Sequence, residues 1–339
     1  ISIQSGNGKP LPEALYLAGN FNNWNPADSN YLFKNGSLFI NLNRDSIAAK
    51  ITGGSWELAE ADADGSARPN RNINLYKSSE ISLTFYGFES HTNHPPRGVK
   101  LITDSSQMMF ESQFRRVWVY LPHDYSATRN RYPVLYLHDG QNLFKGILGS
   151  NTKWAIAGCL DSLQLPLIVI GIEHGGAKRI DELSPFPNAK YGGGKGDAYL
   201  SFIDTQLIPY VDSNFRSIPS AGHRYIGGSS LGGLISLWAI LEYPKRYKGA
   251  LLFSPAYWFN PEVMESLVKA QAPDKGQHRV YQMIGDSEGS NAQAAVSNML
   301  RCDSLLQSSF PSWQLHHKVV AGGKHNEELW QNEFAEALI

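Results

Sequence analysis

The first 84 residues alternate short apolar stretches with turns that are rich in asparagine, glycine and aspartate. Apolar runs of this length between turn residues are typical of β-strands, and they fall at residues 15–17, 38–40, 73–75 and 81–83. We therefore predict a small all-β sandwich, antiparallel and immunoglobulin-like, over residues 1–84. Residues 85–98 contain two prolines and two glycines in polar company, a composition that predicts a linker.

The pattern changes from residue 99 onward, where near-continuous apolar runs alternate with helical patterns. We predict strands at 117–121, 134–137, 167–172, 225–227, 250–253, 280–284 and 316–320. We predict helices at 197–215, 231–243, 262–270, 292–307 and 327–338. Strands that are apolar on both faces and alternate with helices indicate a mostly parallel, doubly wound sheet that is covered on both sides. Residues 99–339 are therefore predicted to form an α/β domain.

Length and composition agree with two domains. Single cores rarely grow beyond roughly 250 to 300 residues, and this chain has 339. No apolar run approaches the ~18 residues of a membrane span, and a formal net charge of −1 gives no general attraction to nucleic acid. The chain begins at Ile1, and we expect an exported protein, periplasmic or secreted, whose signal segment is absent from this chain. The sequence leaves the oligomeric state open.

Candidate chemistry begins with Ser230 in the pentapeptide 228–232 (GSSLG). A predicted strand precedes this serine and an apolar helical run follows it, which is the order that the nucleophile elbow of an α/β-hydrolase requires. Glycines on both flanks let backbone segments pack closely, and the helix start helps to stabilise an oxyanion. A second match, 285–289 (GDSEG) with Ser287, is followed by polar residues where the elbow helix needs an apolar face. We therefore predict Ser230 as the nucleophile of an α/β-hydrolase fold.

A serine nucleophile needs a base and an orienting carboxylate, which in that fold follow it in the order serine, carboxylate, histidine. His325 lies in the loop after the last predicted strand, so we predict it as the base. The acid is expected on the loop after strand 280–284, where both Glu288 and Asp286 lie. Either carboxylate could hold the imidazole, and the residues alone leave the two open.

The remaining parts of the site are predicted from loop positions. The backbone amides of Gln141 and Leu231 are candidates for the oxyanion hole, because Gln141 follows strand 134–137 and Leu231 follows the nucleophile. Trp154 and Trp258 are candidate walls for an acyl or aromatic substrate. We expect no metal and no cofactor, since attack by an activated serine requires neither.

Residues 99–339 resemble the esterase branch of the α/β-hydrolases that includes carbohydrate esterase family one, esterase D-like enzymes and enterobactin-type siderophore esterases. The segments that carry the resemblance are 132–144 (YPVLYLHDGQNLF), 227–233 (GGSSLGG), 253–258 (FSPAYW) and 323–327 (GKHNE). The resemblance implies a serine carboxylic ester hydrolase that acts on feruloyl or acetyl esters of carbohydrates, with a siderophore trilactone esterase as the alternative. It also favours Glu288 as the acid, because the family's acid commonly lies three residues after the glycine that ends the strand, here Gly285.

The first domain resembles the glycogen- and starch-binding sandwiches that accompany isoamylases and the AMP-activated kinase. Residues 17–26 (LAGNFNNWNP) carry most of the likeness, and residues 50–56 (KITGGSW) match more loosely. The resemblance implies that Trp24 and Trp56 stack on sugar rings. The partner expected for the whole chain is therefore a small-molecule or polysaccharide ester. A carbohydrate-binding protein without catalysis is the alternative of another class, and it would retain polysaccharide without reacting at Ser230.

Overall fold

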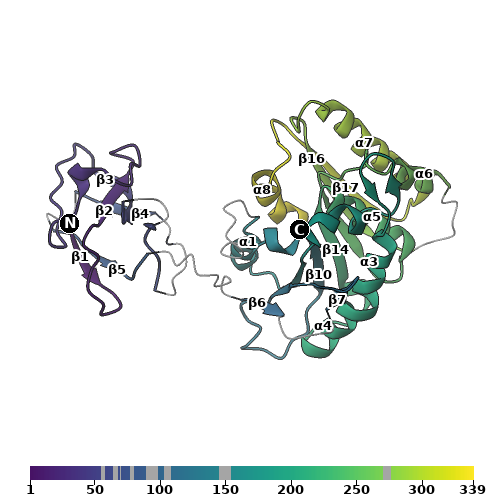
Figure 1. The fold of residues 1–339 in the computed structure, drawn as a ribbon, viewed down its shortest axis with the longest axis horizontal. Coiled ribbons are helices and arrows are strands. Elements are labelled where there is room, and N and C mark those ends of the chain that lie inside the picture. Colours follow the sequence, from purple (N-terminus) through teal and green to yellow (C-terminus); the bar gives the residue numbers. More distant parts are fainter. Residues whose placement is uncertain are drawn as a thin grey trace. The chain divides into compact units, whose positions relative to one another are not determined.

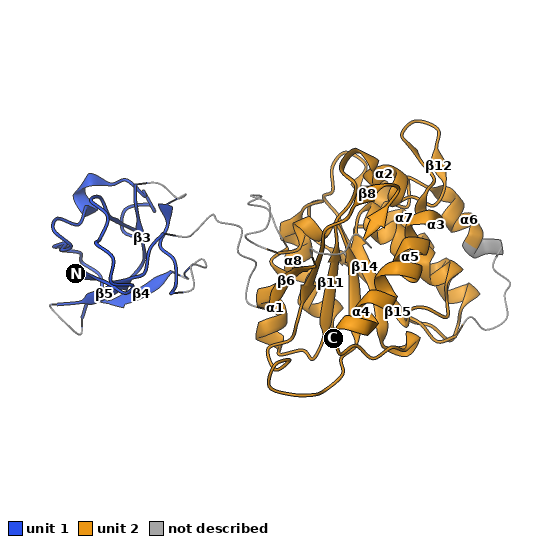
Figure 2. Ribbon diagram, turned by 60° about the horizontal axis from the view of Figure 1, so that its bottom comes forward, with its two compact units in different colours: residues 1–94 blue, residues 95–339 orange. Residues whose placement is uncertain are grey.

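The computed structural model describes residues 1–54, 58–63, 68, 70–76, 80–88, 98–102, 108–144, 154–269 and 276–339. The chain forms two compact units, Ile1–His94 and Pro95–Ile339, which are coloured separately in Figure 2. Each unit has buried apolar clusters of its own, as expected of separate domains. No helix in the described part of the chain is long and apolar enough to cross a membrane.

Two small sheets and one apolar core make up the first unit. Its strands are β1 (Ser2–Ser5), β2 (Tyr16–Gly19), β3 (Ser46–Thr52), β4 (Arg71–Asn74) and β5 (Ser82–Phe85), with a short 3-10 turn, η1 (Ser29–Tyr31), after β2. β3 lies between β2 and β4, and β1 pairs with β5. Alternate strand residues such as Leu17, Ile47 and Ile51 are buried in the core, which is the two-residue period of a half-buried strand.

The first unit differs from the predicted antiparallel sandwich at two points. The three-stranded sheet is antiparallel. β1 and β5, the first and last strands of the unit, pair in parallel. Residues 38–40 form no strand. Leu38 is buried and exchanges two backbone hydrogen bonds with Ile1, whereas Phe39 beside it is 92% exposed. This segment therefore contributes the buried Leu38 and the partly buried Ile40 to the core without forming a strand.

The predicted linker begins too early. β5 continues to Phe85, the carbonyl of Gly87 accepts a hydrogen bond from the amide of Ala61, and Phe88 packs against the core of the first unit. Residues 85–88 therefore belong to that unit, since hydrogen bonds and apolar contacts hold them there. Residues 89–97, the rest of the predicted linker apart from Gly98, lie outside the described part of the chain.

A buried ion pair joins three strands of the first unit. Glu60 is fully buried, and Arg71 at the start of β4 donates to both of its carboxylate oxygens, with the shortest N to O distance 2.6 Å. The same carboxylate accepts from the amide of Ile51 in β3, and the same guanidinium donates to the carbonyl of Thr84 in β5. The pair thus provides hydrogen-bond partners for backbone groups of β3 and β5.

The second unit is built on one large twisted sheet (Figure 1). Its strands are β6 (Val99–Ile102), β9 (Val117–Tyr120), β10 (Val134–His138), β11 (Ile168–Ile172), β14 (Arg224–Ser229), β15 (Gly249–Phe253), β16 (Arg279–Gly285) and β17 (Gln314–Val320). Their order across the sheet is β17, β16, β15, β14, β10, β11, β9 and β6. The strands from β17 to β11 are parallel, and β9 is antiparallel to both of its neighbours. Two short hairpins are formed by β7 (Met109–Phe110) with β8 (Gln113–Phe114) and by β12 (Pro187–Asn188) with β13 (Gly192–Gly193).

Helices cover both faces of this sheet. They are α1 (Ile156–Leu163), α2 (Arg179–Glu182), α3 (Gly196–Phe202), α4 (Ile208–Asn214), α5 (Leu231–Glu242), α6 (Pro261–Lys269), α7 (Ala292–Ser309) and α8 (Glu327–Ala337). Short turns are η3 (Gly140–Asn142), η4 (Gly176–Lys178) and η6 (Ala221–His223), and a π-helical turn, η5 (Ile203–Leu207), joins α3 to α4. One apolar cluster gathers α3 to α7 on one face, and another gathers α1 and α8 on the other (Figure 1).

The prediction of a mostly parallel, doubly wound α/β domain is confirmed. Each strand and helix predicted for residues 99–339 is present, with ends shifted by one or two residues, except that the helix predicted at 197–215 is interrupted by the π-helical turn η5. The central strands are buried along their whole length, because helices lie on both sides of them. Their carboxyl ends all meet at one edge of the sheet, where sites of open α/β folds are found.

We predict that Arg71→Met will destabilise the first unit by about 3 kcal/mol, because the fully buried Glu60 carboxylate then lacks its charged partner. Calorimetric unfolding of the full chain measures this loss. The double variant Arg71→Met/Glu60→Gln keeps an oxygen acceptor for the amide of Ile51 and removes the charge, so it should lose less. A single variant no less stable than the double variant would contradict the assignment.

Candidate active site

Ser230 occupies the sharp turn between β14 and α5. Its backbone has φ 56° and ψ −119°, a conformation that residues with a side chain rarely adopt. Its amide donates to the carbonyl of Phe253 at 2.9 Å, and its own carbonyl accepts from the amides of Leu234 at 3.1 Å and Ala256 at 3.0 Å. These hydrogen bonds hold the strained turn and leave the serine side chain at the carboxyl edge of the sheet.

The two glycines of the pentapeptide lie where the backbone is closely packed. A Cβ atom on Gly228 would lie 3.1 Å from the backbone of Gly232 and 3.2 Å from Cβ of His138. A Cβ atom on Gly232 would lie 3.3 Å from the same His138 atom. All three distances are tighter than ordinary van der Waals contacts. A side chain at either position would therefore have to push the turn and β10 apart by a few tenths of an ångström.

A histidine and a carboxylate lie at the same edge of the sheet. Nδ1 of His325 is 2.7 Å from Oε2 of Glu288, and the two residues come from the loops after β17 and β16. The Glu288 side chain is 4% exposed, whereas the His325 side chain is 41% exposed. Because Nδ1 contacts the carboxylate, Nε2 is the nitrogen available to a serine hydroxyl.

Among the residues that the structure describes, no hydrogen bond joins the Ser230 hydroxyl to the His325 ring. Contacts of this kind are often looser without a bound substrate. Both side chains are at least partly accessible, Ser230 being half-buried and His325 exposed. The arrangement thus provides a strained serine and an oriented, accessible imidazole at one edge of the sheet.

The two candidate acids have different partners. Glu288 contacts His325, as described above, and its Oε1 accepts from the amide of Gly285 at 2.8 Å. Asp286 is exposed, and its Oδ1 accepts from the amide of Gly322 at 2.7 Å and from the hydroxyl of Ser287 at 2.9 Å. Asp286 therefore joins the two loops that carry Glu288 and His325. Ser287, the serine of the second pentapeptide, lies on this exposed loop rather than at a helix start.

Two residues that the sequence analysis did not single out complete the surroundings of Glu288. The hydroxyl of Ser254, directly after β15, lies 2.5 Å from Oε1 of Glu288. Nε1 of Trp330, in α8, donates to the same hydroxyl oxygen at 2.8 Å. The rule that functional side chains follow the carboxyl ends of parallel strands would have pointed to Ser254, but no local motif points to Trp330.

The predicted oxyanion-hole residues lie where the sequence suggested. Leu231 is the first residue of α5, so its amide has no acceptor within the helix. Gln141 lies in η3, directly after β10, and its side-chain oxygen accepts from the amide of His174 at 3.4 Å. The roles of the two backbone amides stay a prediction.

The two candidate wall tryptophans have opposite environments. Trp154 is 2% exposed, because its ring packs in the core against Phe253, Trp330 and Phe334 at centroid distances of 4.8, 5.6 and 6.0 Å. The interpretation of Trp154 as a pocket wall is therefore corrected. Trp258 is 57% exposed, and its ring meets that of Tyr191, itself 45% exposed, at 6.0 Å.

A buried charged cluster lies beside the Ser230 turn. Asp139, after β10, accepts two hydrogen bonds from Arg179 at 2.7 and 2.8 Å. Burial acts to raise the pKa of Asp139, but the charge and hydrogen bonds of Arg179, with weaker help from His174 and His138, outweigh it and hold that pKa below its usual value. The cluster is therefore an internal ion pair rather than an acid that exchanges protons at neutral pH.

His138 is an uncharged member of this cluster. Burial lowers its pKa to about 4, with Asp139 opposing the shift and Arg179 adding to it. Nδ1 lies 3.0 Å from the hydroxyl of Tyr199, and Nε2 is buried without a hydrogen-bond partner. A neutral imidazole thus packs against both glycines of the Ser230 turn.

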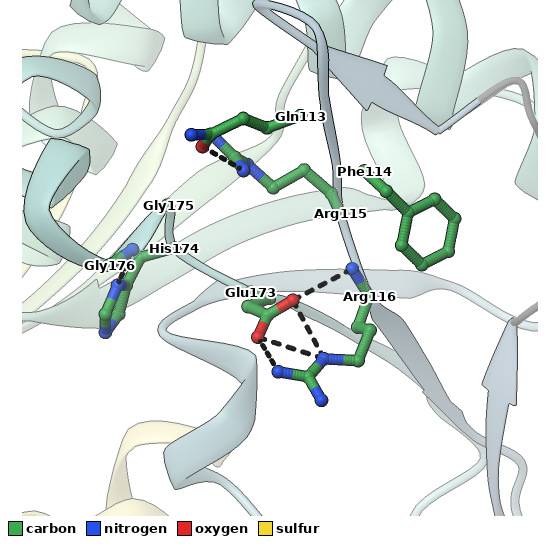
Figure 3. A pocket seen from close by; sticks show the side chains of 8 residues that line it. All are labelled: Gln113, Phe114, Arg115, Arg116, Glu173, His174, Gly175 and Gly176. Carbon is green, nitrogen blue, oxygen red and sulfur yellow. Dashed lines mark hydrogen bonds and ion pairs between the residues drawn. The ribbon is translucent and has the colours of Figure 1, made fainter.

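A pocket of about 450 Å³ opens beyond the end of β11 (Figure 3). It is lined by Gln113, Phe114, Arg115, Arg116, Glu173, His174, Gly175 and Gly176. Neither guanidinium is uncompensated, because Arg115 pairs with Glu182 and Arg116 pairs with Glu173. Ser230, Glu288 and His325 do not line this pocket.

The candidate sugar-binding tryptophans of the first unit are described only in part. Trp24 is half-buried in a turn, with φ 56° and its amide donating to the carbonyl of Gly19 at 2.9 Å. Trp56 lies outside the described residues. Sugar binding by this pair stays a prediction.

Comparison with known proteins identifies the family. Residues 107–339 match the family described as "Putative esterase". The uncharacterized protein YbbA of Bacillus subtilis is 32% identical over 236 residues, which cover 66% of this chain and 91% of that protein. The siderophore triacetylfusarinine C esterase of Aspergillus fumigatus is 28% identical over 147 residues, or 40% of this chain and 48% of that protein.

A solved structure shows the same fold. The enterobactin esterase FES from Shigella flexneri aligns with 96% of this chain and 87% of its own, with a TM-score of 0.54 and 17% identity. The chain belongs to the Putative esterase family, because the family model covers most of it. The protein is accordingly a carboxylic ester hydrolase with an α/β-hydrolase domain.

We predict that Glu288→Gln will lower kcat for p-nitrophenyl acetate by roughly a thousandfold, because a neutral amide cannot stabilise the imidazolium that forms at His325. Asp286→Asn is the matched control. It keeps an oxygen for the amide of Gly322, so kcat should change little. Loss of activity confined to Asp286→Asn would reverse the assignment of the acid.

We also predict a pH dependence of stability that originates at His138. Its folded pKa, about 4, lies below the ordinary value, so the unfolded chain binds more protons between about pH 4 and pH 6.5 and stability falls as pH falls through this window. The loss from about pH 8 to about pH 5 should be about 2 kcal/mol. Urea unfolding of wild type and His138→Asn measures it, and equal pH dependence in both proteins would contradict the origin.

Proposed function

We propose that this esterase works through Ser230, with His325 as base and Glu288 as the residue that orients the imidazole. The observation that carries the proposal is the 2.7 Å contact between His325 Nδ1 and Glu288 Oε2 at the sheet edge that also carries the strained Ser230 turn. An accessible imidazole with a buried acceptor on Nδ1 is suited to take a proton on Nε2.

The reaction proceeds in two halves. The Ser230 oxygen attacks the ester carbonyl while Nε2 of His325 takes the hydroxyl proton, and the imidazolium then returns that proton to the leaving alkoxide. The amides of Leu231 and Gln141 donate to the tetrahedral oxyanion. Water then gives a proton to the same nitrogen and attacks the acyl carbonyl. The bond to the Ser230 oxygen breaks, the imidazolium returns the proton to that oxygen, and the acid leaves. No metal or cofactor takes part in these steps.

We propose feruloyl esters of carbohydrates as the substrate class, with acetyl esters as smaller members. An aromatic pair supports this choice. Trp258 and Tyr191 are both well exposed, and the hydrogen bond from the amide of Ala256 to the carbonyl of Ser230 ties the segment before Trp258 to the nucleophile turn. Exposed indole and phenol rings offer faces on which an aromatic acyl group or a sugar ring can stack.

The first unit and the cellular location belong to the same proposal. Trp24, at its half-buried turn, would contact the carbohydrate chain, and residues 1–88 would act as a carbohydrate-binding sandwich joined by a linker to the catalytic residues 99–339. Export to the periplasm or the medium would bring the protein to polysaccharide esters, which lie outside the cell.

A siderophore ester is the second candidate substrate, favoured by the fungal relative named as a siderophore esterase. A triscatecholate would call for uncompensated cations at the site. Arg179 is paired with Asp139 and Lys195 with Glu111 at 3.0 Å, while Lys145 and Lys153 lie outside the described residues. Arg179 and Lys195, the two described members of this set, are thus both compensated, which supports a less anionic substrate.

We predict that the wild-type protein releases ferulate from feruloylated oligosaccharides with a higher kcat/KM than it shows for a ferric trilactone. Ser230→Ala should reduce both reactions to background. Trp258→Ala should raise KM for the feruloyl substrate about 10-fold through lost stacking and leave acetyl esters nearly unchanged. Activity that survives in Ser230→Ala would overturn the mechanism, and faster trilactone turnover would overturn the order of substrates.

A further inference from the structure

The geometry points to Ser254 as a positioning residue of the esterase, whose hydroxyl, itself held by Trp330, fixes the Glu288 carboxylate that orients His325. This inference rests on the proposed roles of Ser230, Glu288 and His325. It concerns a residue that touches none of the reacting atoms and acts only through Glu288.

Ser254 lies at the centre of the sheet edge. It directly follows β15, which lies between β14, the strand before Ser230, and β16, the strand before Glu288. Ser254 is 1% exposed, and its amide donates to the carbonyl of Met283 at 2.7 Å. The position of its hydroxyl is therefore set by the register of neighbouring strands rather than by a mobile loop.

The direction of each hydrogen bond follows from the chemistry of the partners. An indole nitrogen can only donate, so Nε1 of Trp330, at 2.8 Å, makes the Ser254 oxygen an acceptor. The hydroxyl proton of Ser254 is then free to point to Oε1 of Glu288, at 2.5 Å. An ionised carboxylate can only accept. The chain of donors therefore runs from Trp330 through Ser254 to Glu288.

This chain of donors determines which oxygen His325 uses. Oε1 of Glu288 already accepts from Ser254 and from the amide of Gly285. Oε2 remains for Nδ1 of His325 at 2.7 Å. With both donors on Oε1, rotation of the carboxylate would break two hydrogen bonds of a side chain that is 4% exposed. The proton of the imidazole is consequently held on Nδ1, and Nε2 keeps its lone pair for Ser230.

Trp330 fixes both partners of the pair. Its indole N–H holds Ser254, and its ring meets the His325 ring edge to face, with centroids 5.2 Å apart and planes at 87°. The ring is itself packed on the buried Trp154 at 5.6 Å. One buried side chain of α8 therefore limits the motion of the carboxylate and of the imidazole together.

The backbone conformation at Ser254 favours glycine, which indicates that serine is present here for its hydroxyl. Its φ is 46°, in the left-handed region where glycine is favoured and a side chain adds strain. Glycine would suit the backbone but would supply no donor to Glu288. A serine at this position gives up some backbone stability and provides the hydrogen bond.

Two variants distinguish the effect of losing the Ser254 hydroxyl from the effect of a change in stability. Ser254→Ala keeps the Cβ atom and the strain, whereas Ser254→Gly removes both, so their thermal stabilities should differ, but both lack the donor. We expect kcat for p-nitrophenyl acetate to fall about 10- to 100-fold in both variants, with KM changed by less than about twofold because Ser254 does not contact the substrate.

A double-mutant cycle tests the link to Trp330. Trp330→Phe keeps an aromatic ring against Trp154 but removes the N–H group, so kcat should fall by a smaller factor. The loss that comes from the missing N–H group should not add to that of Ser254→Ala in the double variant, because this group acts through the serine hydroxyl. Additive losses would overturn the relay from Trp330.

The outcome for Ser254 can be told from the outcome for the proposed function. If Ser230→Ala is inactive while Ser254→Ala and Ser254→Gly retain wild-type kcat, the positioning role is wrong and the esterase mechanism stands. If kcat of the two variants instead follows their thermal stability, Ser254 has a structural role only and the inference is overturned. Full activity in Ser230→Ala would overturn the mechanism on which the inference rests.

Discussion

Ser230 holds a backbone conformation, φ 56° and ψ −119°, that would relax unless its surroundings opposed it. The surroundings are the central strands of the sheet. β14 lies between β10 and β15, the amide and carbonyl of Ser230 are bonded to the segment 253–256, and α5 is buried almost all round. Gly228 and Gly232 let this turn approach His138 closely. The position of the serine hydroxyl therefore depends on the packing of the whole α/β domain and not on the pentapeptide alone.

The buried carboxylates of Asp139 and Glu288, at the same sheet edge, are stabilised in different ways. Asp139 and Arg179 neutralise each other, and this pairing holds the pKa of Asp139 below its usual value despite burial. Among the residues that the structure describes, neither an arginine nor a lysine pairs with Glu288. Its carboxylate is surrounded by the hydroxyl of Ser254, the amide of Gly285 and the ring nitrogen of His325. Of these three groups only His325 is well exposed. The imidazole that contacts the buried carboxylate is therefore also the group that a substrate can reach.

Much of this arrangement could be predicted from the sequence, because it depends on local signals. The glycines on both sides of Ser230 and the apolar helix after it predict the turn. Glu288 follows a strongly apolar strand, and His325 follows a strand with clear ends. The structure brings Glu288 and His325 into contact. In the parallel sheet, strand ends converge at one edge, so chain order and strand position were enough to group these residues.

Other features depend on contacts that no local pattern shows. Trp154 looked like a pocket wall because it lies in a loop region, but packing against Trp330 and Phe334 of α8 buries it. Ser254 is a lone serine after a strand, and its role appears only when β15, β16 and α8 are assembled. In the first unit, the parallel pairing of β1 and β5 joins strands that are far apart in the chain. Each of these features required tertiary structure.

Covalent labelling would show whether Ser230 is the activated nucleophile. The intact protein would be treated with a fluorophosphonate ester, digested and analysed by mass spectrometry. We expect one equivalent of phosphonyl group on the peptide that contains Ser230, with loss of esterase activity in step with labelling. Labelling at Ser287, or complete inactivation with Ser230 unmodified, would contradict it.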